Sequence, residues 1–99
     1  MFVHNVFFWL DGAATDQQRQ ELLADCSALL GRIPTVRGLW AGRPAMTPRE
    51  VVDNSYDIGL CVVFDNAVGH DVYQEHALHK QFIAKHKPIW KRVQVYDFT

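Results

Sequence analysis

The chain has 99 residues, enough for one domain, and its 48% hydrophobic content can fill a core, which excludes a disordered chain. Its formal net charge of −1 excludes the strong positive potential that attracts nucleic acids or anionic membranes. No apolar run is long enough to span a bilayer, and residues 2–10 lack the features of a signal peptide. We therefore expect one domain over residues 1–99, located in the cytoplasm, with no nucleic-acid or membrane partner.

The first two elements are predicted as a strand followed by a helix. Residues 2–9 are rich in β-branched and aromatic side chains, which favours a strand. Thr15 and Gln18 have the spacing of a capping box, and Gly31 suits the residue just beyond a helix end. Between them runs an apolar stripe with helical spacing. The stripe consists of Leu22, Leu23, Cys26, Leu29 and Leu30.

Two more strands and a loop are expected in the middle of the chain. Val36–Arg43 predicts a weaker strand, whose glycines at 38 and 42 indicate a bulge or a close backbone approach. Pro44–Asn54 is typical of an exposed loop. Tyr56–Phe64 is apolar on both faces, which favours a central strand covered on both sides.

The last third of the chain predicts a broken helix and a closing strand. Asn66 can cap a helix, and a break near His76-Ala77 separates it from a second helical piece. Val93–Phe98 alternates as the final strand. The resulting β-α-β-β-α-β order predicts an α+β, ferredoxin-like fold with an antiparallel sheet and both helical segments on one face.

Covering one face of this sheet with helices leaves apolar side chains on the other face. An apolar patch of this kind marks an association surface. The sequence therefore predicts a homodimer that forms through the open face of the sheet. On one of the two possible assignments, the open face carries Val3, Phe7, Trp9, Cys61, Val63, Val93 and Val95.

Val72–His79 concentrates more polar chemistry among apolar neighbours than any other stretch. An imidazole titrates near neutrality and a phenol can donate a proton, so His79 and Tyr73 can form an acid-base pair. His4 is a lone polar residue on an apolar strand face. The alternative interpretation is structural, because buried His and Tyr side chains usually have hydrogen-bond partners that stabilise the fold.

Over its whole length the chain resembles the stress-responsive A/B barrel (Dabb) domain family, which belongs to the dimeric α+β barrel group. The most specific feature is Tyr73-x-x-His76-x-x-His79, where family members usually have Tyr-x-x-His-Pro-x-His. Ala77 stands in the place of the usual proline, which would fix the break between the helices. The other matching residues are His4, Val36–Gly42, Tyr56-Asp57, Phe64 and Val95–Phe98.

The resemblance implies a homodimer whose two sheets form a barrel, with a pocket between helices and sheet in each subunit. A plant polyketide cyclase of the family works with a Tyr and His pair at the positions of Tyr73 and His79, and with a His at the position of His4. A further histidine of that cyclase falls at Ile58, which is a departure from its pattern. We accordingly expect catalytic roles for His4, Tyr73 and His79. We expect a pocket lined by Ile58, Phe82 and Trp90.

No metal and no other cofactor is expected. His76 and His79 have a spacing that could share a metal ion, but no third ligand is evident, and a stable zinc site needs three or four. The sequence has no glycine-rich phosphate loop, CxxC, HExxH or nucleophile elbow. His70 and His86 are expected at the surface.

The leading prediction is a Dabb-like homodimer that binds a small aromatic or carbonyl-bearing molecule. One alternative is a cofactor-free cyclase, isomerase or lyase that uses Tyr73 and His79 as an acid-base pair. Another is a structural, stress-related dimer with no ligand. The sequence leaves open whether the protein is an enzyme.

Overall fold

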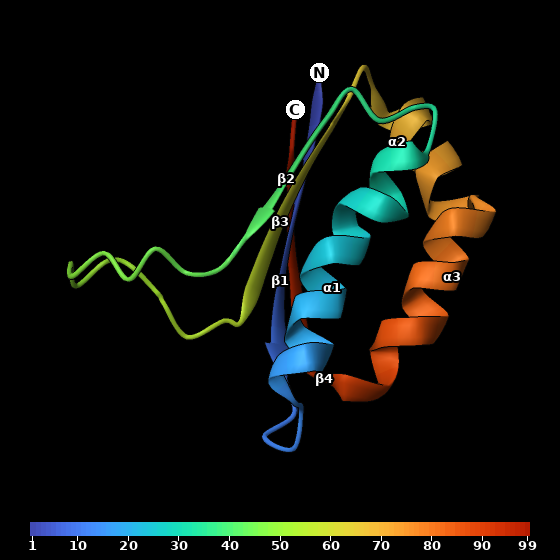
Figure 1. Cartoon of the computed structure of the whole chain (residues 1–99). Coiled ribbons are helices and arrows are strands. Elements are labelled where there is room, and N and C mark those ends of the chain that lie inside the picture. Colours follow the sequence, from blue (N-terminus) through green and yellow to red (C-terminus); the bar gives the residue numbers. More distant parts are fainter.

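One antiparallel sheet carries all the helices on one of its faces (Figure 1). The computed structural model describes residues 1–99. In chain order the elements are β1 (Phe2–Leu10), α1 (Asp16–Ala28), β2 (Gly38–Gly42), β3 (Ile58–Phe64), α2 (Ala67–Glu75), α3 (Ala77–His86) and β4 (Trp90–Phe98). The strands lie in the order β2-β3-β1-β4, which confirms the predicted ferredoxin-like α+β fold. None of the helices has the length and apolar character needed to cross a lipid bilayer.

Strand β1 lies inside the sheet and pairs with β3 on one side and β4 on the other. Its side chains at Val6, Phe8 and Leu10 point toward the helices and belong to the hydrophobic core. Because Val3 of β1 lies opposite Phe98 of β4, the two ends of the chain lie side by side at one end of the sheet (Figure 1). Other core residues include Leu22, Leu30, Ile33, Ile58, Leu60, Val62, Phe64, Tyr73 and Phe82.

Helix α1 begins as the sequence predicts and ends differently. The Gln18 backbone N–H donates to Thr15 Oγ1 at 3.1 Å, and the Thr15 N–H donates to Gln18 Oε1 at 2.8 Å, which completes the capping box. The helix stops at Ala28 and is followed by a 3-10 turn over Leu30–Arg32. Gly31 lies within this turn and has no positive φ, so it is not a left-handed helix cap.

The break between α2 and α3 falls at His76, as predicted. His76 has the extended φ of −67° and ψ of 144° that is usual for a helix N-cap. Its Nδ1 accepts a hydrogen bond from the Leu78 backbone N–H at 3.0 Å. The histidine therefore stops α2 and starts α3, which keeps the two helices separate although Ala77 replaces the usual proline.

The open face of the sheet differs from the predicted one at β4. Val95 lies opposite Val6 and Val93 opposite Phe8, so both valines point toward the helices and their assignment to the open face was wrong. Strand β4 begins at Trp90 rather than at Val93, and its register with β1 shifts between Trp9 and Leu10. By the same register, the open face carries Val3, Asn5, Phe7, Trp9, Trp40, Cys61, Val63, Gln94, Tyr96 and Phe98.

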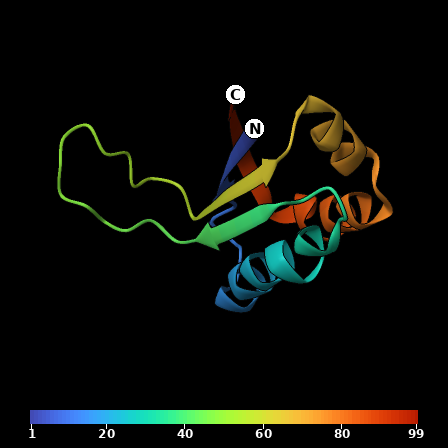
Figure 2. The same ribbon diagram turned by 90° about the horizontal axis from the view of Figure 1, so that it is seen from above.

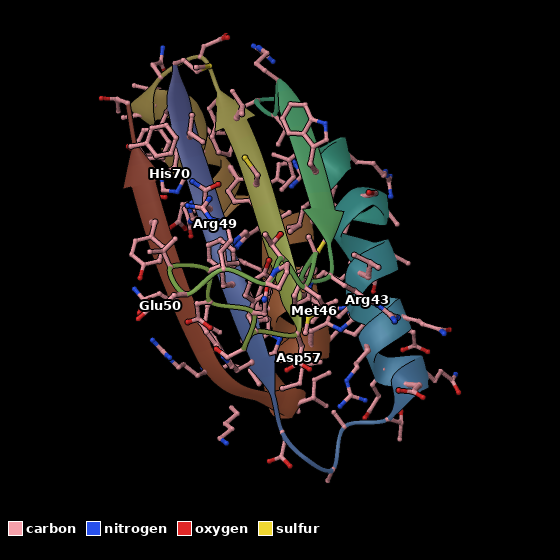
Figure 3. All side chains as sticks on the ribbon, turned by 90° about the vertical axis from the view of Figure 1, so that its left-hand side faces the viewer. Arg43, Met46, Arg49, Glu50, Asp57 and His70 are labelled. Carbon is pink, nitrogen blue, oxygen red and sulfur yellow. The ribbon has the colours of Figure 1, made fainter.

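Residues 43–57 form a long loop that extends away from the open face (Figures 1 and 2). The chain has no helix or strand there, which confirms the predicted loop and shortens both neighbouring strands relative to the prediction. Figure 3 shows Arg43, Met46, Arg49 and Glu50 of this loop in front of the sheet. We call residues 43–57 the arm.

The two β2 glycines mark neither a bulge nor a close backbone approach, but Gly38 has a side chain packed against it. A Cβ atom at Gly38 would lie 2.6 Å from the Trp40 ring, whereas one at Gly42 would have no atom within 4 Å. Gly38 therefore leaves the room that the Trp40 side chain occupies on the open face.

His86 lies between two helices, so its predicted surface position was wrong. It is 3% exposed, and its Nε2 lies 2.7 Å from Asp25 Oδ2 on α1. Lys85 Nζ lies 2.8 Å from the same oxygen. Burial by itself would raise the pKa of Asp25, but hydrogen bonds from Lys85 and His86 outweigh it and hold this pKa below its usual value. This cluster fastens α1 to α3.

We expect Asp25→Ala to lower the free energy of unfolding by about 2 kcal/mol at pH 7, because it leaves His86 buried without its partner. The loss should shrink as the pH falls. The pKa of Asp25 in the folded protein lies below 3.8, its value in the unfolded chain. The ionised carboxylate therefore stabilises the fold fully above pH 3.8. This stabilisation is lost as the pH falls through the pKa of the folded state. Urea denaturation at pH 7 and pH 3 measures both effects.

Glu75→Ala is the control, because it breaks an exposed 3.6 Å pair with Lys80 that is worth less than about 0.5 kcal/mol. Equal losses in the two variants would contradict the assigned role of Asp25.

Candidate functional site

A cavity of about 140 Å³ lies between the helices and the part of the sheet formed by β1 and β4. Ten of its thirteen lining residues are hydrophobic, so it suits an apolar ligand with few polar groups. The other three are His4, Gln74 and His79, and Tyr73, counted among the ten, adds a phenol hydroxyl. The cavity thereby brings His4 together with Tyr73 and His79, which lie about 70 positions later in the sequence.

Two of the three predicted apolar lining residues reach the cavity. Phe82 of α3 and Trp90 at the start of β4 line it, but Ile58 does not. Ile58 is completely buried in the core. It lies on β3, whereas its pairing partner Phe8 lies on β1, which is next to β4. Phe8 lines the cavity and Ile58 does not reach it. The expectation that Ile58 contacts a ligand is therefore not met in this structure.

His4 is held in a defined orientation by an acidic residue of the neighbouring strand. Its Nδ1 lies 2.6 Å from Oδ1 of Asp97, which faces it directly across the β1–β4 ladder. A carboxylate can only accept at this distance, so Nδ1 carries the proton. In the neutral ring Nε2 is then the free acceptor. His4 thus meets the usual condition for a buried histidine and keeps one nitrogen for another partner.

Tyr73 presents a protonated phenol beside the two histidines. The residue is 1% exposed, and burial, with a smaller contribution from Cys26, raises the pKa of its hydroxyl well above the usual value. Its ring meets the His4 ring edge-on at 5.9 Å and the His79 ring edge-on at 4.8 Å between centroids. The phenol therefore stays a hydrogen-bond donor over the physiological pH range.

His79 lies against Tyr73 by ring packing and makes no hydrogen bond with it. Desolvation, followed by the nearby His4 and His70, lowers the pKa of His79, which favours the neutral ring at pH 7. A neutral imidazole beside a protonated phenol is the combination of base and acid that the sequence suggested. The expected direct pair is replaced by an edge-to-face contact, which leaves the polar atoms of both rings free for a third group.

Trp90, which the sequence predicted only as a lining residue of the pocket, also brings a polar group to the cavity. Its indole Nε1 is buried and has no hydrogen-bond partner in the protein. Buried donors almost always have a partner, so an unpaired one calls for an explanation. A ligand atom is one such partner, because Trp90 lines the cavity.

Three polar residues of this region were missed from the sequence. Asp97 lies 93 positions from His4 and becomes its neighbour only through strand pairing. Gln74 is a cavity residue that follows Tyr73 directly in α2. His70, expected at the surface, is half-buried and stacks on Phe2 with 4.5 Å between ring centroids. Only Gln74 could have been suggested by the sequence, because it lies within the polar stretch Val72–His79.

The comparisons with known proteins agree on one family and one fold. The family model described as "Stress responsive A/B Barrel Domain" matches residues 2–99. No curated protein matches the chain. Several solved structures share its fold over nearly its full length.

A dimeric ferredoxin-like protein of unknown function from Thermobifida fusca is 20% identical, with 99% of this chain and 89% of that chain covered and a TM-score of 0.84. A Dabb family protein from Mesorhizobium loti is 21% identical, with 99% and 94% covered and a TM-score of 0.81. A hydroxynitrile lyase from Passiflora edulis is 14% identical, with 98% and 90% covered and a TM-score of 0.81. At these identities the likeness is one of fold.

Proposed function

Since the chain belongs to the stress-responsive A/B barrel (Dabb) family, we propose that it is a cytoplasmic homodimer that binds a small aromatic, carbonyl-bearing molecule in the cavity beside His4. The observation that carries this proposal is an apolar cavity lined by two imidazoles and a buried phenol, next to an unpaired buried indole N–H. Unpaired polar groups of this kind favour a ligand that has acceptors to match them.

The size of the cavity suits a ligand with one ring. A protein cavity of about 150 Å³ lined by apolar side chains binds benzene. The cavity here has about 140 Å³, so it has room for one ring with a short polar substituent. A carbonyl oxygen on that ring can accept a hydrogen bond from the Tyr73 hydroxyl, which remains protonated.

We expect the protein to bind acetophenone in preference to ethylbenzene, which has a similar size and lacks the carbonyl group. Tyr73→Phe should weaken acetophenone binding about tenfold, because it removes one hydrogen-bond donor, and should leave ethylbenzene binding unchanged. Isothermal titration calorimetry of both compounds measures the difference.

Tyr56→Phe is the matched control, since Tyr56 packs against Phe7 on the open face and lies outside the cavity. Failure of acetophenone to bind, or the same loss in both tyrosine variants, would contradict the proposed site.

Catalysis by the same groups is a second candidate function. It is favoured by the protonation states of the two rings, because His79 is biased toward the neutral form and Tyr73 toward the protonated form. A neutral imidazole can take a proton from the carbon next to a carbonyl group while the phenol stabilises the oxygen of the resulting enolate. A lyase with this fold, the hydroxynitrile lyase from Passiflora edulis, makes an enzyme of this architecture reasonable.

If His79 is a general base, the protein will catalyse the exchange of the acetophenone methyl protons for deuterium in D₂O, which proton NMR follows directly. His79→Gln should reduce the exchange to the rate without protein, because an amide cannot take up the proton. Tyr56→Phe should exchange at the wild-type rate. Binding of acetophenone without accelerated exchange would support a binding protein and reject the catalytic role.

The second part of the proposal is that a second copy of the chain covers the open face of the sheet. This face exposes large aromatic side chains, with Trp40 63%, Tyr96 60% and Phe98 59% exposed. An exposed apolar patch on this scale is typical of an association surface. Structurally similar proteins, including the one from Thermobifida fusca, are described as dimeric.

The arm supports a partner on this face. It extends from the same face as the aromatic residues and exposes Met46 and Val51, at 65% and 80% (Figure 2). A two-fold axis through the open faces would bring each arm to the other subunit, since both copies use the same surface. Met46 and Val51 would then be covered.

We expect Phe7→Glu to convert the dimer into a monomer, because it places a charge at the centre of the open face where a partner would desolvate it. Size-exclusion chromatography with light scattering measures the mass. Val68→Glu is the control, since Val68 is 68% exposed on α2 and lies away from this face. A monomeric wild-type protein, or a Phe7→Glu variant that remains dimeric, would contradict the proposed interface.

A further inference from the structure

His4, His70 and Asp97 form a cluster of potential metal ligands outside the cavity. They come from β1, α2 and β4, and each offers one ligand atom within 4.8 Å of the other two. His70 and Asp97 do not line the cavity, so the cluster lies on the other side of His4. In Figure 3, His70 lies behind the β1–β4 pair, near the end of the sheet where β4 finishes.

The spacing of the three ligand atoms is close to that of an ion site. A tetrahedral zinc ion with bonds of about 2.0 Å places neighbouring ligand atoms about 3.3 Å apart. To reach this spacing, the distance between His4 Nδ1 and Asp97 Oδ1, now 2.6 Å, would increase by less than about 1 Å. The distances between the other ligand atoms, now at most 4.8 Å, would decrease by about 1.5 Å at most. Asp97 lies on an edge strand and its side chain is 34% exposed, so it is free to make such a shift.

Two neighbouring side chains contact the His70 ring and limit its orientation. Gln74, one helical turn farther along α2, places its side-chain amide 3.0 Å from His70 Nε2. The amide nitrogen is the atom at this distance, so a half-turn of the amide plane would be needed for the oxygen to accept the Nε2 proton and leave the Nδ1 lone pair available. Stacking on Phe2 at 4.5 Å holds the ring from the other side. Metal-binding histidines are usually fixed by a hydrogen bond of this kind to the second nitrogen.

We propose that His4, His70 and Asp97 bind a divalent transition-metal ion, with Zn²⁺ as the chemical match. Two imidazoles and one carboxylate are typical zinc ligands, whereas Mg²⁺ and Ca²⁺ prefer oxygen alone. Binding through His4 Nδ1 releases to solvent the proton that this nitrogen donates to Asp97. Three protein ligands leave the fourth position of the ion to water.

The ion would connect three elements, of which only β1 and β4 are already linked through these side chains, by the hydrogen bond from His4 to Asp97. It would tie the short helix α2 to the edge strand β4 through the central strand β1. The proposal does not depend on a ligand in the cavity or on catalysis. His4 is the one residue that the two sites share.

Titration of the full-length protein with Zn²⁺ by isothermal titration calorimetry tests the site. We expect one ion per chain. His70→Ala and Asp97→Asn should each weaken binding by at least about 100-fold, because each removes one of three ligands. Gln74→Ala should weaken it by about 10-fold, as expected for a group that only orients a ligand. Co²⁺ in place of Zn²⁺ should give the visible absorption bands of a low-symmetry site, and the bands should be lost in His70→Ala.

His79→Gln is the control, because it removes a nearby imidazole that is outside the cluster. Circular dichroism establishes that each variant is folded, and His70→Gln replaces His70→Ala if the alanine variant is not. Unchanged zinc affinity in the folded His70 and Asp97 variants would overturn the proposal. A loss in His79→Gln as large as that in His70→Ala, or no saturable binding to the wild-type protein, would overturn it as well.

Discussion

The central strand β1 is mostly apolar on both faces and is hydrogen-bonded along both edges, and the rest of the molecule follows from these two properties. The helices cover only one of its faces, so the other face needs a different cover. The one ionisable side chain on the strand, His4, points toward the helices and requires a partner there. That partner is Asp97, which lies opposite His4 on β4 and accepts a hydrogen bond from it. The cavity, the cluster of ligand atoms and the proposed association surface all include residues of this strand.

Hydrophobic periodicity was sufficient to predict the element order and the fold. The capping box at Thr15 and the helix break at His76 were also predicted, because each depends on residues within a few positions of one another. Gly31 was misread because the helix tightens into a 3-10 turn instead of ending in a left-handed residue. Helix ends depend on how the following chain packs, and that information is not local.

The faces of β4 could not be assigned from its own sequence. Val93 and Val95 alternate with Gln94 and Tyr96, so either set is able to face a core. The choice is made by pairing with β1, which sets Val95 opposite Val6 and Val93 opposite Phe8. The actual assignment lets the valines close the cavity and leaves Tyr96 on the open face.

Candidate residues of the site were predictable where they are rare polar groups in apolar surroundings, as His4, Tyr73 and His79 are. Their partners were not, because Asp97 and His70 meet His4 only in the folded sheet and helix layer. His86 was misassigned because two lysines flank it. Its spacing of four residues from Phe82 places it on the buried side of α3, which helical periodicity could have indicated.

The pairing of Val3 with Phe98 places both chain ends at the same edge of the molecule, while the arm lies between β2 and β3 and contributes no residue to the core. The backbone therefore nearly returns to its starting point, and its long exposed loop, the arm, is not at the chain ends. A short peptide could join the present ends, and new ends opened within the arm would leave every strand and helix uninterrupted. Such a circularly permuted chain would keep the cavity on a continuous framework and would test whether the intact arm is needed for association.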